Sequence, residues 1–172
     1  MALTLQEKKE IVSEVAAVAA SAYSAVAAEY RGLTVAQLTT LRQNARKNGV
    51  YLRVVKNNLA RIAVKGTAFE CIQDGLVGPL VLAFSQEDPG SAARLIKDFK
   101  KDKAHDKMEV KFVAIDGAML PASELDRLAK LPTRDQALAT LAAVLRAPLD
   151  KFARTLAALR DQKAEAAGIS LD

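Results

Sequence analysis

Apolar residues recur at helical or strand spacing along most of the chain, and capping signals indicate where several helices begin. In a capping box, Ser or Thr precedes a helix and Glu or Gln follows three residues later. Each side chain then bonds a backbone N–H that the helix leaves unpaired. We therefore expect a helix after each threonine of three such pairs. They are Thr4 with Glu7, Thr34 with Gln37, and Thr133 with Gln136.

Four segments have the composition of β-strands. Residues 24–30 and 80–84 are mostly small or apolar, whereas residues 50–55 and 109–115 alternate between apolar and polar side chains. Helical patterns lie between them, so the order from the first strand to the last is β-α-β-α-β-α-β. This order predicts an α+β domain, an α/β layer of ferredoxin-like or related topology that one helix precedes. The apolar run at 80–84 is expected to be a central strand.

The sequence also predicts where the helices of this domain begin and which side chains they bury. We expect Asn57 or Asn58 to be one N-cap, and Asp88 to be another with Pro89 at the first helical position. Arg61 and Lys65 are expected on an outer face, because they lie four residues apart. The expected buried side chains are Val35, Leu38, Leu41, Ala45, Leu59, Ile62, Ala63, Ala92, Ala93, Leu95, Ile96 and Phe99.

Leu131-Pro132-Thr133 is the expected boundary between two domains, an α/β domain at residues 1–131 and a helical tail at residues 132–172. The tail has helical spacing over residues 134–167. Pro148 lies in its middle and lacks the N–H that an α-helix needs, so it is expected to kink or break the helix.

The tail nearly repeats itself and carries one apolar side. Thr140-Leu-Ala-Ala-Val-Leu-Arg146 is followed by Thr155-Leu-Ala-Ala-Leu-Arg160. Such a stripe either docks on the chain's own α/β domain or binds another protein. The repeat favours binding to another protein, with two equivalent binding sites for helical partners. The residues of the stripe are Leu138, Leu141, Leu145, Leu149, Phe152, Leu156 and Leu159.

Composition excludes several classes of protein. The chain is 51% hydrophobic and 26% charged, which is typical of a globular protein rather than a disordered one. Glutamates precede its first apolar run, which argues against a signal peptide. The Ala-rich run at residues 15–28 is shorter than the roughly 20 apolar residues that span a membrane. We expect a cytoplasmic protein with no membrane partner.

Residues with catalytic or metal-binding chemistry are few and scattered. The single cysteine, Cys71, is expected to be a small buried thiol, and the single histidine, His105, lies in a charged linker where a solvated side chain is expected. Glu124 and Asp126 do not share a helix face, and the glycines form no phosphate-binding loop. We therefore expect no enzyme, no cofactor and no metal site.

Positive charge is concentrated in the first third of the chain. Residues 1–66 contain ten basic and four acidic residues, whereas residues 67–133 contain nine and eleven. No acidic residue lies between Glu29 and Glu70. Folded surfaces normally mix both signs, so this segment predicts a surface for phosphates, the alternative being a solvated basic face. Its basic residues are Arg31, Arg42, Arg46, Lys47, Arg53, Lys56, Arg61 and Lys65.

Two turns in this basic segment follow strands and open helices. They are Arg31-Gly32-Leu33-Thr34 and Lys56-Asn57-Asn58. If the two strands are parallel, both turns and both helix N-termini emerge at one end of the sheet, where N–H groups bind phosphate. A plain N-cap for the Asn residues, and a solvent-facing strand position for Arg53, are the structural alternatives.

The motifs together resemble the stalk-base protein family of the bacterial large ribosomal subunit, the ribosomal protein L ten family. The likeness covers nearly the whole chain, and the order and spacing of its motifs make it specific. The motifs are Leu3–Lys9, Tyr30-Arg-Gly-Leu-Thr34, Gly49–Leu59, Phe69-Glu-Cys71, Val77-Gly-Pro79, Gly90–Leu95, Leu131-Pro-Thr133 and Arg154–Arg160.

The resemblance implies an N-terminal domain that binds large-subunit ribosomal RNA at the GTPase-associated region, beside the eleventh large-subunit protein. It also implies that the tail carries dimers of the small acidic stalk protein, which recruit translation GTPases, and two repeat units predict two dimers. The stripe of the tail is the implied stalk-protein site. The implied RNA-binding residues are Arg31, Gly32, Lys56, Asn57, Asn58 and Arg61, followed by Arg42, Arg46, Arg53 and Lys65.

The primary hypothesis is a structural, non-enzymatic RNA-binding adaptor of the ribosome. A free regulatory protein that binds messenger RNA is the first alternative, and regulation of its own messenger RNA is compatible with both. An enzyme that uses the α/β domain is the second alternative, and it requires a pocket with convergent polar groups.

Overall fold

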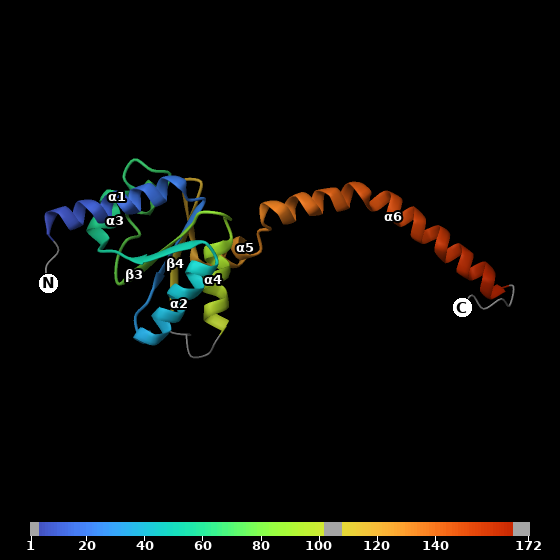
Figure 1. Cartoon of the computed structure of the whole chain (residues 1–172), viewed down its shortest axis with the longest axis horizontal. Helices are drawn as coiled ribbons and strands as arrows, with labels where there is room; N and C mark the ends of the chain where they lie inside the picture. Colours follow the sequence, from blue (N-terminus) through green and yellow to red (C-terminus); the bar gives the residue numbers. More distant parts are fainter. Residues whose placement is uncertain (1–3, 102–107, 167–172) are drawn as a thin grey trace. The chain divides into compact units, whose positions relative to one another are not determined.

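The computed structural model describes residues 4–101 and 108–166. His105, expected to be solvated, lies outside these ranges. The chain divides into two compact units, Met1–Leu131 and Pro132–Asp172. The first contains a sheet with its helices, and the second contains one long helix (Figure 1).

The sheet has five strands in the order β2-β3-β1-β4-β5, and every neighbouring pair is antiparallel. This confirms the four expected strands, with the apolar segment at 80–84 near the centre. The short strand β5 was not expected from the sequence. It forms a hairpin with β4 through Asp116 and Gly117, both at positive φ, as a tight turn with this twist requires. The strands are β1 (Ser24–Glu29), β2 (Val50–Val54), β3 (Leu80–Ser85), β4 (Glu109–Ile115) and β5 (Ala118–Pro121).

The connections give a split β-α-β arrangement, which confirms the expected α+β class and ferredoxin-like order. Strands β1 and β2 run in the same direction, with β3 antiparallel between them. Helix α2 joins β1 to β2, and α3 with the short 3₁₀ turn η1 joins β2 to β3. The elements outside the sheet are α1 (Leu5–Ser21), α2 (Val35–Lys47), α3 (Asn57–Val64), η1 (Glu70–Ile72), α4 (Ser91–Lys101), η3 (Ala122–Glu124) and α5 (Leu125–Ala129).

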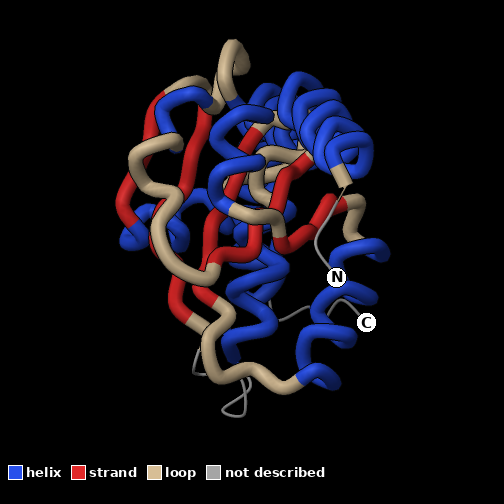
Figure 2. Tube along the Cα trace, turned by 90° about the vertical axis from the view of Figure 1, so that its left-hand side faces the viewer, coloured by secondary structure: helices blue, strands red, loops and turns tan. Residues whose placement is uncertain are grey.

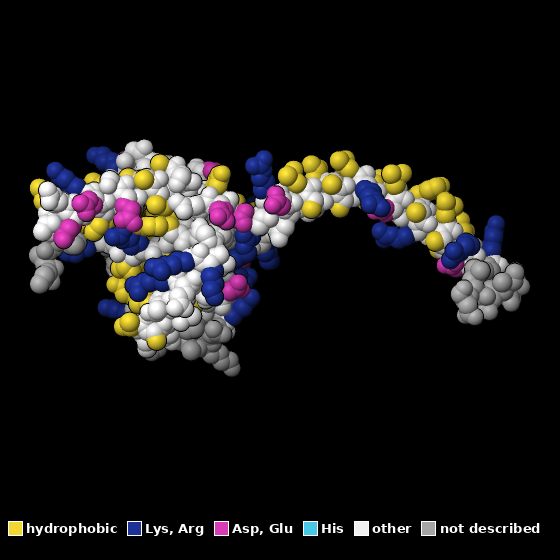
Figure 3. All heavy atoms as spheres, in the orientation of Figure 1, with side chains coloured by type: hydrophobic (Ala, Val, Ile, Leu, Met, Phe, Trp, Pro, Cys, Tyr) yellow, Lys and Arg dark blue, Asp and Glu magenta, His cyan; other side chains and the backbone are white. Residues whose placement is uncertain are grey.

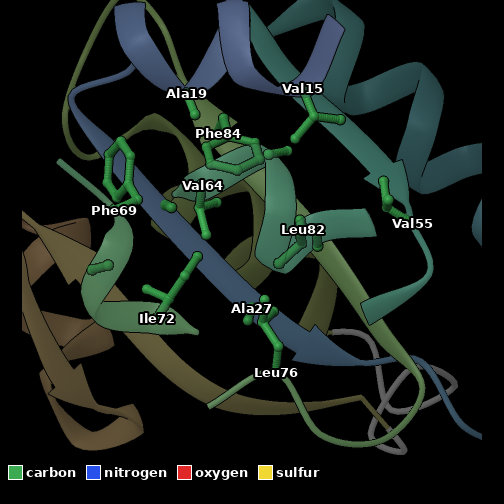
Figure 4. Close-up of a cluster of buried hydrophobic side chains, with 14 of the residues drawn as sticks. Val15, Ala19, Ala27, Val55, Val64, Phe69, Ile72, Leu76, Leu82 and Phe84 are labelled. Atoms are coloured by element: carbon green, nitrogen blue, oxygen red, sulfur yellow. The ribbon is translucent and has the colours of Figure 1, made fainter. Parts of the chain in front are cut away.

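Helices cover both faces of the sheet, which lies between them in Figure 2. Helices α1 and α3 pack on one face, where the rings of Phe69 and Phe84 meet edge to face with centroids 5.9 Å apart (Figure 4). Helices α2, α4 and α5 cover the other face, around Leu41, Ile96 and Leu128. Two buried layers around one sheet account for the stability of this unit.

Local capping patterns locate two of the helices in this unit. The capping boxes at Thr4 and Thr34 are both present, with each side chain and backbone N–H bonded reciprocally. The expected N-cap at Asp88 is wrong, because α4 begins at Ser91. Its Ala92 N–H donates instead to Ser85 Oγ at 3.1 Å, so a serine at the end of β3 caps this helix from a distance in the sequence.

Several expected buried faces need correction. Leu41, Ala45 and the five expected positions of α4 are buried, but Val35, the first residue of α2, is 78% exposed. In α3 the small side chains face inward and Ile62 is 60% exposed. The buried residues of α3 are Ala60, Ala63 and Val64. Cys71, expected to be buried, is only partly so.

The second unit is helix α6 (Arg134–Ala166), which the third capping box starts at Thr133 and Gln136. Of the two expected outcomes at Pro148, a kink or a break, the helix does not break: it is continuous through Pro148, and Figure 1 shows it bent along its length. Proline leaves the carbonyl four residues earlier without its helical donor, which accounts for bending without termination.

Candidate nucleic-acid and helix-binding surfaces

The two basic turns emerge at the same end of the sheet, as expected if their strands are parallel. Strands β1 and β2 do run in the same direction, because each pairs antiparallel with β3, which lies between them. The turn at residues 30–34 and the connection at residues 55–57 therefore lie at one end of the sheet.

A hollow of about 650 Å³ lies at this end of the sheet. Its walls come from Tyr30 after β1, from residues 54–59 at the end of β2 and the start of α3, from residues 78–80 at the start of β3, and from Lys8 of α1. Among the described residues, no acidic one lines it. We call this hollow, with the adjoining turn at residues 30–34, the strand-end surface.

Backbone and amide hydrogen bonds hold the loop before β3 in place. The Tyr30 N–H donates to the carbonyl of Pro79 at 3.3 Å, and the Asn57 Nδ2 donates to the carbonyl of Gly78 at 3.0 Å. Gly78 has φ of +94°, in the left-handed region that favours glycine. The loop, β1 and α3 are thereby joined around the hollow.

The backbone N–H groups at the N-terminus of α3 have no side-chain cap. The expected Asn N-cap is wrong, because Lys56 is the cap residue and no side chain bonds the first turn. Asn57 bonds the loop instead, and the exposed Asn58 has no side-chain partner among the described residues. First-turn N–H groups without a cap are available to an anion.

Two expected RNA-binding arginines are engaged within the fold. Arg61 was expected to point outward, but it is half-buried and donates to the carbonyls of Gln73 and Leu76 at 3.1 and 3.0 Å. This correction goes with that of Ile62, since α3 presents its small residues to the core and turns its isoleucine to solvent.

Arg53, expected to be solvent-facing or RNA-binding, joins α1 to β2. It forms an ion pair with Glu14 and lies 3.1 Å from the Tyr51 hydroxyl, which donates to Glu14 at 2.8 Å. The hydrogen bonds from Arg53 and Tyr51 hold the pKa of Glu14 below its ordinary value of 4.5. We call these three residues the Glu14 cluster.

The other candidate basic residues are exposed and have no ion-pair partner among the described residues. Arg42 and Arg46 share one face of α2, one turn apart. Gly32 has φ of +87°, so its turn needs glycine there. The exposed cations of the basic segment are Arg31, Arg42, Arg46, Lys47, Lys56 and Lys65.

The seven stripe residues of α6 are all exposed, between 51% and 74%. They lie along one side of the helix, where Figure 3 shows apolar side chains in a row. A polar pair lies elsewhere on the helix, with Arg146 and Asp150 3.0 Å apart. A helix cannot cover its own apolar side, and such a stripe is typical of a helix face that packs against another surface.

Comparison with known proteins identifies the family. A family model described as ribosomal protein L10 matches residues 3–101, and a second, described as ribosomal protein uL10 C-terminal region, matches residues 131–167. The chain belongs to the ribosomal protein L10 family. The resemblance found in the sequence is thereby confirmed.

Bacterial relatives share most of this L10-family chain. The large ribosomal subunit protein uL10 of Thioalkalivibrio sulfidiphilus is 65% identical, over 95% of this chain and 98% of the relative. The proteins of that name from Methylococcus capsulatus and Alcanivorax borkumensis are 60% and 57% identical. These alignments cover 95% and 97% of this chain, and 98% and 100% of the relatives.

Membership of the L10 family gives the chain its general role. It is a structural constituent of the large ribosomal subunit and is located in the cytoplasm with the ribosome. No helix in the described ranges is long and apolar enough to cross a membrane.

Sequence reasoning missed several residues that line the hollow. Lys8, Tyr30, Gly78 and Pro79 belong to segments far apart in the chain, and only the fold brings them together. Two signals were present, because the motifs that carry the family resemblance include Tyr30 and Val77-Gly-Pro79. A motif alone does not indicate which other motif it meets in space.

Proposed function

We propose that the chain binds large-subunit ribosomal RNA through its strand-end surface and carries dimers of the small acidic stalk protein on α6. The RNA is the GTPase-associated region, and the eleventh large-subunit protein is the neighbour there. Two dimers bind, one to each repeat of α6, and they recruit the translation GTPases. The chain itself is not an enzyme in this proposal.

One observation carries the RNA half of the proposal. Arg31 and Lys56 are exposed at one end of the sheet without carboxylate partners, beside an α3 N-terminus that no side chain caps. Phosphate binding needs cations and N–H donors that the protein does not itself neutralise. Arg53 and Arg61 are excluded from the main contact set, because their guanidinium groups are already bonded within the fold.

The stalk half of the proposal rests on the exposed stripe. Burying five or six Leu and Phe side chains supplies roughly 10 kcal/mol of gross hydrophobic free energy before association costs. The near-repeat on either side of Pro148 places equivalent residues, such as Leu141 and Leu156, in each binding site. Two similar binding sites favour two copies of the same partner.

A charge-removal experiment tests RNA binding. The double variant Arg31→Ala, Lys56→Ala is expected to weaken binding to a large-subunit ribosomal RNA fragment. It should also reduce the slope of log affinity against log salt by about two, because each lost phosphate contact contributes about one. Lys130→Ala, an exposed cation outside the strand-end surface, is the control. A wild-type slope in the double variant would exclude these contacts.

Two truncations test the assignment of α6. A chain that ends at Thr133 should no longer copurify with coexpressed stalk protein, while its RNA affinity stays within about twofold of wild type because the first unit is intact. A chain that ends at Ala147 keeps one repeat and should carry one dimer instead of two by native mass spectrometry. Stalk dimers on the shorter chain, or two on the longer, would contradict the assignment.

A further inference from the structure

The strand-end hollow contains a feature that phosphate binding does not require. Its lining includes apolar residues, which we call its floor: Val54 at the end of β2, Leu59 in α3 and Pro79 before β3. Phosphate contacts need only donors and positive charge. Apolar lining residues together with Lys8 and Lys56 are instead suited to a ligand with flat, apolar faces and a charged backbone.

The polar groups at the hollow can form hydrogen bonds with the edge of such a ligand. The amide of Asn58 has no partner among the described residues, and Asn57 uses its Nδ2 for Gly78 while its Oδ1 remains an acceptor. An amide offers both donors and acceptors, as the edges of nucleobases do. Tyr30 adds an aromatic side chain to the wall, and aromatic side chains stack on unpaired bases.

We propose that this hollow receives one unpaired nucleobase of the large-subunit RNA, an inference that rests on the proposed RNA-binding function. The base lies against the apolar floor and presents its edge to Asn58. Lys8 and Lys56, which both line the hollow, meet the phosphates that flank it. The absence of carboxylates from the lining matches the negative backbone of this ligand.

The shape of the hollow favours an unpaired base over a double helix. Bases in an A-form duplex are stacked, and the surface that the duplex presents is its shallow minor groove and its phosphates. A concave site with an apolar floor buries no apolar surface against a duplex. It gains from a base that is turned out of its stack, because both the floor and the base then leave water.

The experiment fills the hollow without removing a charge. Val54→Trp places a large side chain in the floor at a 39% exposed position on edge strand β2. With a ribosomal RNA fragment as probe, binding by the full chain should weaken at least about tenfold at an unchanged salt slope. Met119→Trp, 46% exposed on the opposite edge strand β5, is the matched control and should bind as wild type does.

Two further measurements complete the test. Asn58→Ala, at an exposed position, should weaken binding severalfold at wild-type slope even if Val54→Trp proves unstable. Chemical probing of Watson–Crick edges should show an unpaired base that wild type protects and Val54→Trp leaves reactive. Wild-type affinity in Val54→Trp and Asn58→Ala, or protection of duplex positions alone, would overturn the base site. The charge-removal experiment would then still test the phosphate contacts separately, and failure of wild type to bind the RNA would overturn both.

Discussion

Phe84 and Phe152 are the same residue type in opposite surroundings. Phe84 lies in β3 and is 1% exposed, between the rings of Tyr51 and Phe69, whereas Phe152 lies in α6 and is 64% exposed. The first belongs to a core that the chain completes by itself. The second belongs to the exposed stripe of α6, which we propose binds another protein. The two units therefore differ in whether this aromatic side chain is buried or exposed.

The cations of the basic segment also fall into two groups, those bonded within the fold and those exposed to solvent. Arg61 bonds two carbonyls of its own fold, whereas Lys56 lies at the hollow, whose described lining includes no carboxylate. Charge density along the sequence does not distinguish these roles. Only the partner of each side chain shows whether it stabilises the fold or is available to a ligand.

The largest expected effect is on the free energy of unfolding, and it distinguishes Phe84 from Phe152. Phe84→Ala should lower the free energy of unfolding by about 3–5 kcal/mol, because it leaves a cavity under two aromatic rings. Phe152→Ala should change it by less than about 0.5 kcal/mol, since an exposed side chain loses little on truncation. Urea unfolding of both variants measures the difference. Equal losses would mean that α6 packs on the first unit.

A second comparison concerns two cations on α3. Arg61→Ala should lower the free energy of unfolding by about 2–4 kcal/mol, because two carbonyls lose a charged donor. Its salt slope for RNA binding should stay that of wild type. Lys65→Ala removes an exposed side chain that has no ion pair within the described part of the chain, and it should leave stability within about 0.5 kcal/mol. Denaturant curves and salt titrations of both variants are the measurement, and a reduced slope in Arg61→Ala would reverse the assignment.

The smallest effect concerns pH and the Glu14 cluster. The pKa of Glu14 is lowered in the folded state, so its contribution to stability is complete above the ordinary value of 4.5 and is lost as pH falls through the folded pKa. The group is half-exposed, so the contribution is at most about 1 kcal/mol. Glu14→Gln should be less stable than wild type at about pH 7, and the difference should close as the pH falls through the lowered pKa of Glu14. A gap that persists in acid would exclude the ion pair as its cause.

The sequence predicted the features that depend on nearby residues. Three capping boxes, the strand of alternating residues 50–55 and the apolar strand at 80–84 all formed as expected. Each is determined by side chains within a few positions of one another. The family was also evident, because its motifs are local strings in a fixed order.

What the sequence did not show depends on distant partners. The start of α4 is set by Ser85, and the inward turn of Arg61 is set by carbonyls at residues 73 and 76. Strand β5 is four residues long and ends in Pro121, too short and too poor in β-branched residues to be distinguished from a loop. Lys8 and Pro79 entered the candidate site only through the fold.

The ties between α3 and the loop before β3 have a thermodynamic consequence for recognition. Arg61 holds the carbonyls of Gln73 and Leu76, and Asn57 holds that of Gly78, so the wall of the hollow is shaped before any ligand arrives. A preorganised wall loses little conformational entropy when it is occupied. More of the contact free energy is then retained as affinity, and the free and occupied walls should superimpose closely.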